Sequence, residues 1–409
     1  MINSNNNISF CANIRNIPKL NIPKRVLKLN DAKLNGYTAF INGKIYDSSN
    51  KIKFGDILLK NNQIIAINEF DENSINGIIK YVDIKDKILT PTLIDEHIHG
   101  GYGVNFHSSD EKSIRKFLKQ LAKEGTGAIL ATTLPGTLEH LNKQLKLLNY
   151  IIKNPDKGAT KILGIHLEGP FLNPKKAGIH PPEALLKPSI ENFEKLDSEN
   201  VKIVTLAPEL DQNYELSKYL KNRGIIPSAG HSTADASDIK ESGITQVTHL
   251  FNAMAPFHHR LPTVANEGLL NPKITAEMNT DTSLLVPDTM NLIMREKPKD
   301  KLILISDALP QAGIKKDFLL NGIRIHVNPD WIATSDRGIL AGSMKFLHEV
   351  AAKLIKETNM TFEKFIRYAS VNPAKNLGVE NDYKIAKGSK PDFAIWDKNS
   401  LKVEKTFIN

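Results

Sequence analysis

The sequence contains a single cysteine, Cys11, so no intrachain disulfide can form and the disulfide-rich secreted domains are excluded. It also lacks an apolar run near the roughly 18 residues that a membrane-spanning helix needs, because its longest apolar runs have the length of single strands. The segment before Asp31 contains no acidic residue, is rich in asparagine and carries five basic residues. This segment has few serines and alanines and no clear amphipathic pattern, which disfavours a transit peptide. We therefore expect a cytoplasmic protein in which residues 1–35 form a disordered or loosely packed extension.

Positive charge is in moderate excess: the 409 residues include 54 basic and 45 acidic ones, which leaves a net charge of +9. The lysines are spread through helical and loop segments and do not interleave with aromatic residues, as they would along a nucleic-acid groove. An AT-rich genome, which favours lysine, asparagine and isoleucine, accounts for the excess better than nucleic-acid binding does. A modest attraction for an anionic substrate stays open. With 41% hydrophobic and 24% charged residues, the composition is that of a globular protein.

Short strands with alternating apolar and polar residues are predicted near both ends of the chain. In the N-terminal part they read TAFINGKIYDSS, GDILLKNNQIIAINEF and IIKYVDIK, with Asn-Gly and Asn-Asn pairs as turns. In the last thirty residues they read SKPDFAIWD and KVEKTFI. We therefore predict that residues 36–88 and 380–409 together form a small β-sandwich domain around a central domain.

Between these ends, apolar strands alternate with segments of helical periodicity such as DEKSIRKFLKQLAKE and LEHLNKQLKLLNYIIK. Strand–helix alternation with continuous apolar strands predicts a parallel sheet that is covered on both faces. Eight such units match an α/β fold of the (β/α)8 TIM-barrel type, which we predict for residues 89–379. The predicted strands are Lys87–His99, Gly127–Leu134, Lys161–Glu168, Val201–Glu209, Gly224–Ser232, Gln246–Met254, Lys273–Asp281 and Lys301–Ala308.

Polar residues that can bind a metal lie at the carboxyl ends of these strands, where barrels of this type carry their chemistry. His97 and His99 are two residues apart on one strand, so both side chains face the same way. A lone His-x-His pair is weak evidence, but four further residues stand at the ends of later strands. Imidazole and carboxylate together suit Zn²⁺, or Fe²⁺ and Mn²⁺ in some settings. The candidate metal ligands are His97, His99, Glu168, His231, His249 and Asp307.

Seven motifs, in order, cover roughly residues 38–400 and carry a resemblance to a known family. They are PTLIDEHIHGGYG, HLEGPFLNP with GIHPPE, AGHSTAD, THLFNAM with HHR, ISDALPQAG, LAGS and VNPAKNLG. The chain resembles the amidohydrolase superfamily and, within it, the family of N-acetylglucosamine-6-phosphate deacetylases. HLEGPFLNP and THLFNAM are far more specific to that family than His-x-His. Dihydroorotases and N-acyl amino acid deacylases are alternatives against which Glu168 and THLFNAM count.

The resemblance implies hydrolysis of the N-acetyl amide of N-acetylglucosamine 6-phosphate to glucosamine 6-phosphate and acetate, a step of amino-sugar catabolism. It implies that Glu168, His231 and His249 bind the principal metal. Family members that bind two ions keep the His-x-His pair, and this chain keeps it as His97 and His99. We therefore expect one or two divalent ions per subunit, with Glu168 bridging. Asp307 is expected to act as general base and then as general acid; a buried helix N-cap is its structural alternative.

The same resemblance implies where substrate binds and that the protein forms a homodimer, with part of each site completed across the interface. Asn252, Ala253 and Arg260 are expected to hold the sugar phosphate. The backbone at Ile179 and His180 should meet the sugar hydroxyls, and His180 should help to stabilise the oxyanion. The sugar pocket should be lined by Leu340, Ala341, Gly342 and Ser343.

Two segments depart from the family pattern, and both lie on the substrate side. The seventh strand ends in Asp281-Thr282-Ser283-Leu284, where the family has Asp-Gly-x-His and the histidine contacts substrate. Arg260 is followed by Leu261-Pro262-Thr263, where the family tends to have an acid, proline and glycine. Three readings stay open: weaker binding of the usual substrate, another N-acetyl sugar or sugar phosphate, or a catalytically decayed protein. The intact set of metal ligands argues against decay.

Overall fold

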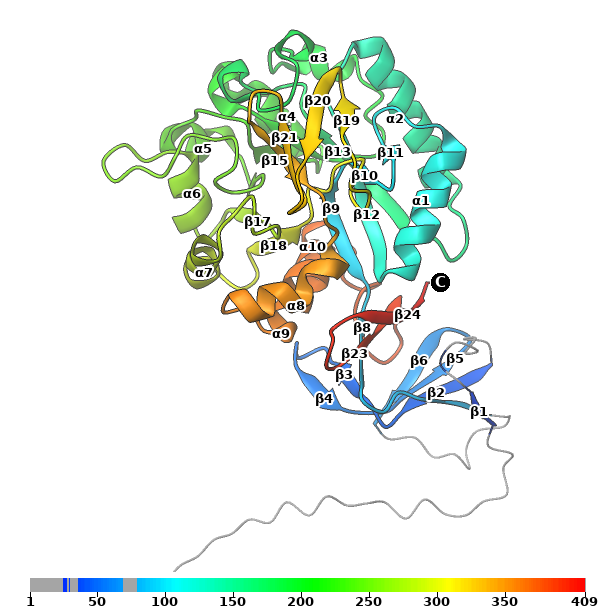
Figure 1. Cartoon of the computed structure of the whole chain (residues 1–409). Coiled ribbons are helices and arrows are strands. Elements are labelled where there is room, and N and C mark those ends of the chain that lie inside the picture. The colour runs from blue at the N-terminus through cyan, green and yellow to red at the C-terminus, as the bar shows by residue number, and fades with distance from the viewer. Residues whose placement is uncertain (1–24, 28, 30–35, 69–78, 409) are drawn as a thin grey trace, which may run out of the picture.

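The computed structural model describes residues 25–27, 29, 36–68 and 79–408, and Figure 1 shows a barrel with a smaller β domain below it. Most of the predicted N-terminal extension, residues 1–35, lies outside the described residues. Within it, strand β1 (Arg25–Leu27) pairs in parallel with β7 (Ile79–Asp83). No helix in the described part of the chain combines the length and the hydrophobicity of a membrane-spanning segment.

Eight parallel strands form the barrel, in the order β18-β17-β16-β15-β14-β13-β12-β9. A parallel bridge between Ile98 and Ala308 brings the first and last strands together, so the barrel is nearly closed. Each observed strand overlaps one of the eight predicted apolar runs, and the predicted TIM-type barrel is confirmed. The strands are β9 (Leu93–Ile98), β12 (Thr126–Thr133), β13 (Lys161–Glu168), β14 (Val201–Leu206), β15 (Ile226–Ala229), β16 (Gln246–Val247), β17 (Thr275–Asn279) and β18 (Leu302–Ile305).

Helices surround the barrel and bury their apolar faces against its strands (Figure 1). The first of them begins after Asp110, whose side chain accepts a hydrogen bond from the Ser113 amide, and ends at Lys123. Its residues Ile114, Phe117 and Leu121 recur at helical spacing and are buried. The α-helices are α1 (Glu111–Lys123), α2 (Leu138–Lys153), α3 (Ile190–Glu194), α4 (Glu215–Asn222), α5 (Ala236–Ser242), α6 (Val264–Leu270), α7 (Pro287–Glu296), α8 (Leu347–Glu357), α9 (Phe362–Ile366) and α10 (Asn372–Asn376).

The smaller domain contains two five-stranded sheets, one built from N-terminal strands alone and one that combines strands from both ends of the described chain. Phe40 lies in one core with Phe393 and Phe407, at ring distances of 6.2 and 5.5 Å. The predicted β domain built from both ends is thereby confirmed. The strands of the first sheet are, in order, β1, β7, β2 (Tyr37–Ile41), β5 (Ile57–Lys60) and β6 (Gln63–Ile67). Those of the second sheet are, in order, β24 (Val403–Phe407), β23 (Phe393–Asp397), β8 (Lys87–Pro91), β3 (Lys44–Tyr46) and β4 (Ile52–Phe54).

The predicted strand Lys87–His99 divides at Thr92, where the chain crosses from the β domain into the barrel. Its first half is β8, which pairs with β23 and β3 in the small domain, and its second half is β9 of the barrel. The Thr92 amide donates to the carbonyl of Asp392, and the Ser370 hydroxyl donates to the carbonyl of Thr92. The crossing point is therefore held by residues from the C-terminal part of the chain.

A four-stranded antiparallel sheet follows β18 and was not predicted from the sequence. It stands at the end of the barrel opposite the β domain, in yellow and orange in Figure 1. This position places its last strand beside the carboxyl ends of the barrel strands. The strands are β19 (Phe318–Leu320), β20 (Ile323–Val327), β21 (Ile332–Ser335) and β22 (Leu340–Ser343), and a two-stranded hairpin of β10 (Gly100–Gly101) and β11 (Val104–Asn105) follows β9.

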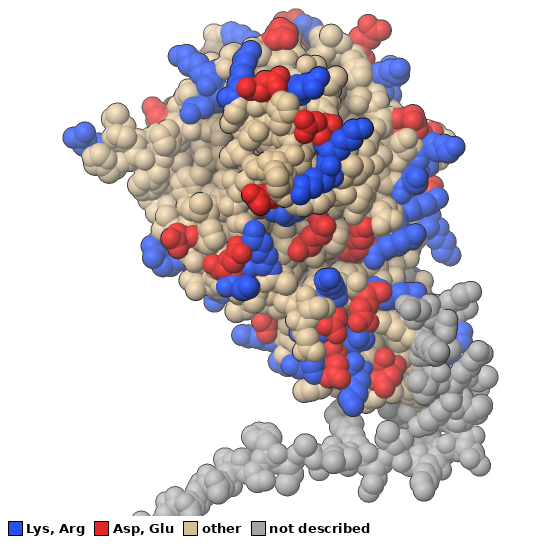
Figure 2. Space-filling model, viewed as in Figure 1, with Lys and Arg blue, Asp and Glu red and all other residues tan. Residues whose placement is uncertain are grey.

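Basic and acidic side chains are interspersed over the face of the molecule in Figure 2. Several lysines of the described chain are paired with acidic residues, for example Lys87 with Glu404 at 2.6 Å. A mixed surface of this kind offers no extended field of one sign to a polyanion on this face. The absence of a nucleic-acid partner stays a prediction.

Candidate metal centre

Glu168 lies at the centre of a cluster of histidines inside the barrel. It is the last residue of β13, and the chain turns away from the strand at a cis Gly169–Pro170 peptide bond. Its side chain is 4% exposed, which is costly for a carboxylate without cationic partners. Burial raises the pKa of Glu168, but the surrounding histidines, His97 first among them, outweigh burial and hold it well below its usual value. Glu168 is therefore ionised and surrounded by potential metal ligands.

The two oxygens of Glu168 face different histidines. Oε1 lies 3.5 Å from Nε2 of His97, 3.2 Å from Nε2 of His231 and 3.0 Å from Nε2 of His249. Oε2 lies 3.2 Å from Nε2 of His99 and 3.4 Å from Nε2 of His180. Each oxygen of this one carboxylate therefore has two or more imidazole nitrogens within 3.5 Å, so Glu168 is in reach of every candidate histidine ligand.

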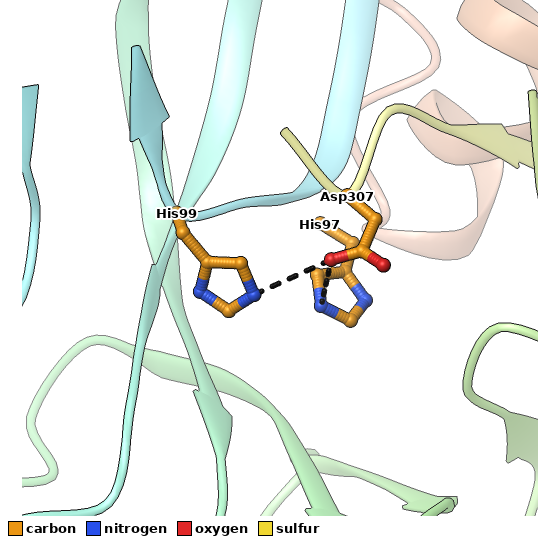
Figure 3. Close-up of side chains that lie close together, drawn as sticks. All are labelled: His97, His99 and Asp307. Carbon is orange, nitrogen blue, oxygen red and sulfur yellow. Dashed lines mark ion pairs between the residues drawn. The ribbon is translucent and has the colours of Figure 1, made fainter. Parts of the chain in front are cut away.

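Asp307, which follows β18, lies beside His97 and His99 at the end of β9, as Figure 3 shows. Its Oδ1 lies 3.4 Å from Nε2 of His99 and 3.7 Å from Nε2 of His97. Its other oxygen accepts a hydrogen bond from Nδ2 of Asn279 at 3.2 Å. One oxygen of Asp307 is therefore held by the protein, while the other faces the cluster.

Hydrogen bonds to the protein fix the tautomers of two of these histidines. Nδ1 of His231 donates to the carbonyl of Lys176 at 2.7 Å, and Nδ1 of His97 donates to the carboxylate of Glu277 at 3.0 Å. Burial lowers the pKa of His231 to about 4, so its ring is neutral near pH 7. With the proton on Nδ1, Nε2 is the atom that each ring presents to Glu168. It is unprotonated in His231, whereas burial of His97 is outweighed by the charges of Glu168 and Glu277, which raise the pKa of His97 well above its usual value, so a metal ion would displace a proton there.

The donor atoms fit a divalent cation. The unprotonated Nε2 of His231 faces a carboxylate oxygen at 3.2 Å and Nε2 of His249 at 3.2 Å. Nε2 of His97 is buried and has no hydrogen-bond partner. Electron pairs that point at one another in a buried site repel unless a cation or a proton lies between them. Imidazole nitrogens with a bridging carboxylate are the ligands that Zn²⁺ and related ions prefer.

His166 lies two residues before Glu168 on β13, close to this cluster, but it does not belong to the cluster. Its ring nitrogens lie 3.0 Å from the carbonyl of Glu96 and 2.7 Å from Oγ1 of Thr205. Burial lowers its pKa to about 4. Because both nitrogens are used by neutral partners, His166 is a packing residue and not a metal ligand.

Three of the candidate ligands have left-handed backbone conformations, which non-glycine residues rarely adopt. The φ angles are 47° at His231, 32° at His249 and 52° at Asp307. Such conformations cost of order 1–3 kcal/mol each and persist only where the surrounding structure imposes them. Here each one follows a barrel strand and turns a side chain toward the cluster.

A cavity of about 460 Å³ opens above the cluster. It contains most of the residues that the sequence predicted for substrate binding, together with Leu284 of the divergent segment. Arg260 is exposed and does not line this cavity, and neither does Ser343, which is buried and donates its hydroxyl to Asp281. Predicted residues that line the cavity are Ile179, His180, Asn252, Ala253, Leu340, Ala341 and Gly342.

Several residues around the site were not identified from the sequence. Lys175 and Lys176 line the cavity and follow directly after the HLEGPFLNP motif, which could have drawn attention to them. Asn279 and Glu277 contact Asp307 and His97 from β17. Both lie inside a short strand-like run, and the alternation of residue types in that run does not indicate which distant residues they contact.

Comparisons with known proteins agree with this arrangement. The model of the amidohydrolase family matches residues 88–409. The chain is 38% identical over 305 residues to the N-acetylglucosamine-6-phosphate deacetylase of Bacillus subtilis (strain 168), which covers 72% of this chain and 76% of that protein. It is 28% identical over 329 residues to the N-acetylgalactosamine-6-phosphate deacetylase of Escherichia coli O157:H7, covering 79% and 86%.

A solved structure is similar over nearly the whole chain. The crystal structure of the N-acetylglucosamine-6-phosphate deacetylase from Thermotoga maritima superposes with a TM-score of 0.80 at 27% sequence identity. The superposition covers 90% of this chain and 98% of that one. All three proteins are deacetylases of amino-sugar phosphates by name.

Proposed function

The chain belongs to the amidohydrolase family, as its motifs indicated, and we propose that it hydrolyses the N-acetyl amide of N-acetylglucosamine 6-phosphate to glucosamine 6-phosphate and acetate. The observation that carries this proposal is the cluster of histidines around Glu168, with Asp307 beside it, of which all but His97 line the cavity. A phosphorylated sugar does not cross a membrane unaided, so the proposal includes a cytoplasmic location.

The residues of the cluster would hold one or two divalent ions, of which zinc is our first choice because nitrogen and oxygen ligands are mixed. Glu168, His231 and His249 would hold the first ion. His97, His99 and Asp307 would hold the second, with Glu168 shared. When bound, such ions polarise an amide carbonyl and lower the pKa of water.

We assign the proton transfers to Asp307. Amide hydrolysis needs a base that takes a proton from water and an acid that gives one to the departing amine nitrogen. Asp307 faces the cluster with one oxygen while Asn279 holds the other at 3.2 Å, so the same carboxylate can perform both steps without rotating. His180, which lines the cavity beside Glu168, would stabilise the negative charge that develops on the acetyl oxygen.

The sugar and its phosphate would occupy the outer part of the cavity. Oδ1 of Asn252 is buried without a hydrogen-bond partner, while its Nδ2 donates to the carbonyl of Leu284 at 3.1 Å. The free oxygen can accept a hydrogen bond from a sugar hydroxyl. Lys175 and Lys176 are cationic residues at the cavity wall and would attract the phosphate.

Arg260 would act in the site of a second subunit. It stands on an exposed loop outside the cavity of its own chain, beside the exposed apolar residues Phe257 and Leu261. A homodimer in which this loop reaches the partner would bury the apolar residues and bring Arg260 to a phosphate. Co-expression of Asp307→Asn with Arg260→Ala tests this. If Arg260 acts in trans, each mixed dimer has one intact site, and a randomly paired preparation, about half of it mixed dimers, regains about a quarter of wild-type activity.

Acetate release tests the proposed activity. Protein treated with a chelator should release no acetate from N-acetylglucosamine 6-phosphate, and addition of Zn²⁺ should restore release. Unphosphorylated N-acetylglucosamine should be a much poorer substrate. Bound metal without acetate from any of these sugars would refute the proposal.

N-acetylgalactosamine 6-phosphate is a second candidate substrate. Leu284 lines the cavity at the segment where the family pattern has a substrate-contacting histidine, and a relative carries that activity in its name. The same assay with both epimers decides between them through the ratio of their kcat/KM values.

A further inference from the structure

Glu277 is a fully buried carboxylate on β17 that contacts the metal centre without touching the cavity. Its side chain is 0% exposed, and it is not among the residues that line the cavity. Oε2 accepts one hydrogen bond from Nδ1 of His97 at 3.0 Å and another from the backbone amide of His249 at 3.1 Å. Oε1 accepts a third from Nε2 of Gln246 at 2.9 Å.

The backbone of β16 explains why His249 needs this partner. The ladder between β16 and β17 ends at the pair Val247 and Ala276, and the His249 amide finds no backbone carbonyl in either neighbouring strand. The carbonyl of Glu277 accepts from the Leu250 amide at 2.9 Å, and its carboxylate accepts from the His249 amide. Glu277 thus holds the turn in which His249 adopts its φ of 32°.

The ring of His97 depends on the same oxygen. A carboxylate can only accept a hydrogen bond, so Nδ1 of His97 carries a proton, and Nε2 is the nitrogen that faces Glu168 and Asp307 and would bind a metal ion. Without Glu277, the ring could rotate or change tautomer, and the protonated nitrogen could face the cluster. A carboxylate behind an imidazole also makes that imidazole a better ligand.

We propose that Glu277 is a positioning residue that joins the two halves of the metal centre, fixing the ring of His97 on one side and the backbone of His249 on the other. This inference rests on the proposed metal site. One carboxylate on β17 thus controls the metal affinity of ligands that come from two other strands.

A neighbouring carboxylate provides a matched control. Glu96 is also 0% exposed and accepts from Nε2 of Gln246 at 2.9 Å and from Nδ2 of Asn376 at 3.1 Å. It belongs to the same buried network, but its carboxylate touches none of the histidines. Burial and the charge of Glu277 raise the pKa of Glu96 to about 8, so its carboxyl is largely neutral near pH 7. Glu96→Gln therefore reports what the exchange of a carboxyl for an amide does in this network when no ligand is held by the altered group.

The experiment measures the affinity of the full-length protein for Zn²⁺ alone, by competition with a chelator and in the absence of substrate. Glu277→Gln keeps the shape of the side chain and one acceptor, and removes the charge. We expect the dissociation constant for Zn²⁺ to rise about 10- to 100-fold in Glu277→Gln and to change by less than threefold in Glu96→Gln. Glu277→Asp, which keeps the charge but draws the oxygens back, should lie between wild type and Glu277→Gln.

The outcomes separate the inference from the function on which it rests. A wild type that binds no Zn²⁺ overturns both. A wild type that binds Zn²⁺ while Glu277→Gln binds it equally well, or while Glu96→Gln loses as much affinity, overturns the inference alone. The melting temperature of each metal-free variant is measured beside its affinity. A lowered melting temperature with unchanged affinity would make Glu277 a structural residue only.

Discussion

The hydroxyl of Ser343 donates a hydrogen bond to Oδ2 of Asp281 at 2.9 Å and so ties β22 to the end of β17. Oδ1 of Asp281 accepts from Nζ of Lys345 at 3.1 Å and from the hydroxyl of Ser283 at 2.8 Å. Since the residues just before Ser343 line the cavity, this contact places the cavity wall relative to the barrel. The divergent segment that begins at Asp281 is therefore a fixed part of the site.

Ser343→Ala should move the wall and weaken substrate binding. Loss of the hydroxyl leaves one oxygen of a buried carboxylate without its donor, which costs about 1–3 kcal/mol of stability. We expect KM to rise and kcat to change little, since no group at the cluster is removed. Urea unfolding and steady-state kinetics measure the two effects. Thr334→Ala on β21 is the control, and equal effects of both substitutions would contradict the role of Ser343.

Asp281→Asn should make the stability of the protein less dependent on pH in the acidic range. Burial raises the pKa of Asp281, but the hydrogen bonds from Ser283 and the charge of Lys345 outweigh burial and lower it below the usual value. A lowered folded-state pKa means that the stabilisation is complete above the unfolded-state pKa of about 3.9 and is lost as the pH falls through the folded-state pKa. The stability difference between wild type and Asp281→Asn, measured on metal-free protein, should therefore shrink from pH 6 toward about pH 3. A difference that grows on acidification would show the opposite sign of shift.

Asp307→Asn should retain metal and lose turnover. The amide keeps the size of the carboxylate and an oxygen that can face His99, but it cannot take a proton from water. General acid–base groups of this kind contribute about 10²- to 10⁴-fold, and we expect a loss of kcat in that range. Elemental analysis and acetate release are measured on the same preparation, with the exposed Asp300→Asn as control. Activity within tenfold of wild type would remove Asp307 from the mechanism.

Leu284→His should improve the use of N-acetylglucosamine 6-phosphate. Leucine at the cavity wall offers no hydrogen bond, whereas a histidine there can donate one to the substrate. A single hydrogen bond of about 1 kcal/mol corresponds to roughly a fivefold fall in KM. Val286→His, at an exposed position two residues away, is the control. An unchanged or higher KM would favour a different substrate for the wild-type cavity.

The barrel and its candidate ligands could be predicted because both depend on local signals. Each strand is a short apolar run between turns, and a polar residue at the end of such a run is visible as an exception. Glu168, His231 and His249 were found in this way. Their common location followed from the rule that parallel strands of a barrel end on one face.

The remaining features depend on contacts between distant segments, which no single run reveals. Glu277 looks like one polar position of an ordinary strand, and only the end of the β16 ladder makes it a partner of His249. The strands β19 to β22 are three to five residues long and partly exposed, so their pattern is weak. The position of Arg260 depends on the path of a loop, which the residue types do not determine.

The division of the run Lys87–His99 into β8 and β9 has a consequence for biosynthesis. β8 pairs with β23, so the base of the strand that carries His97 is completed by residues 393–397. The ribosome adds about 300 residues between these two segments, at roughly 5–20 residues per second. The chain therefore spends tens of seconds with β8 paired to β3 alone, and with the edge of β8 that β23 later covers still open. An open strand edge can pair with another chain, so this edge of β8 is a place where the nascent protein is exposed to aggregation until its last residues are made.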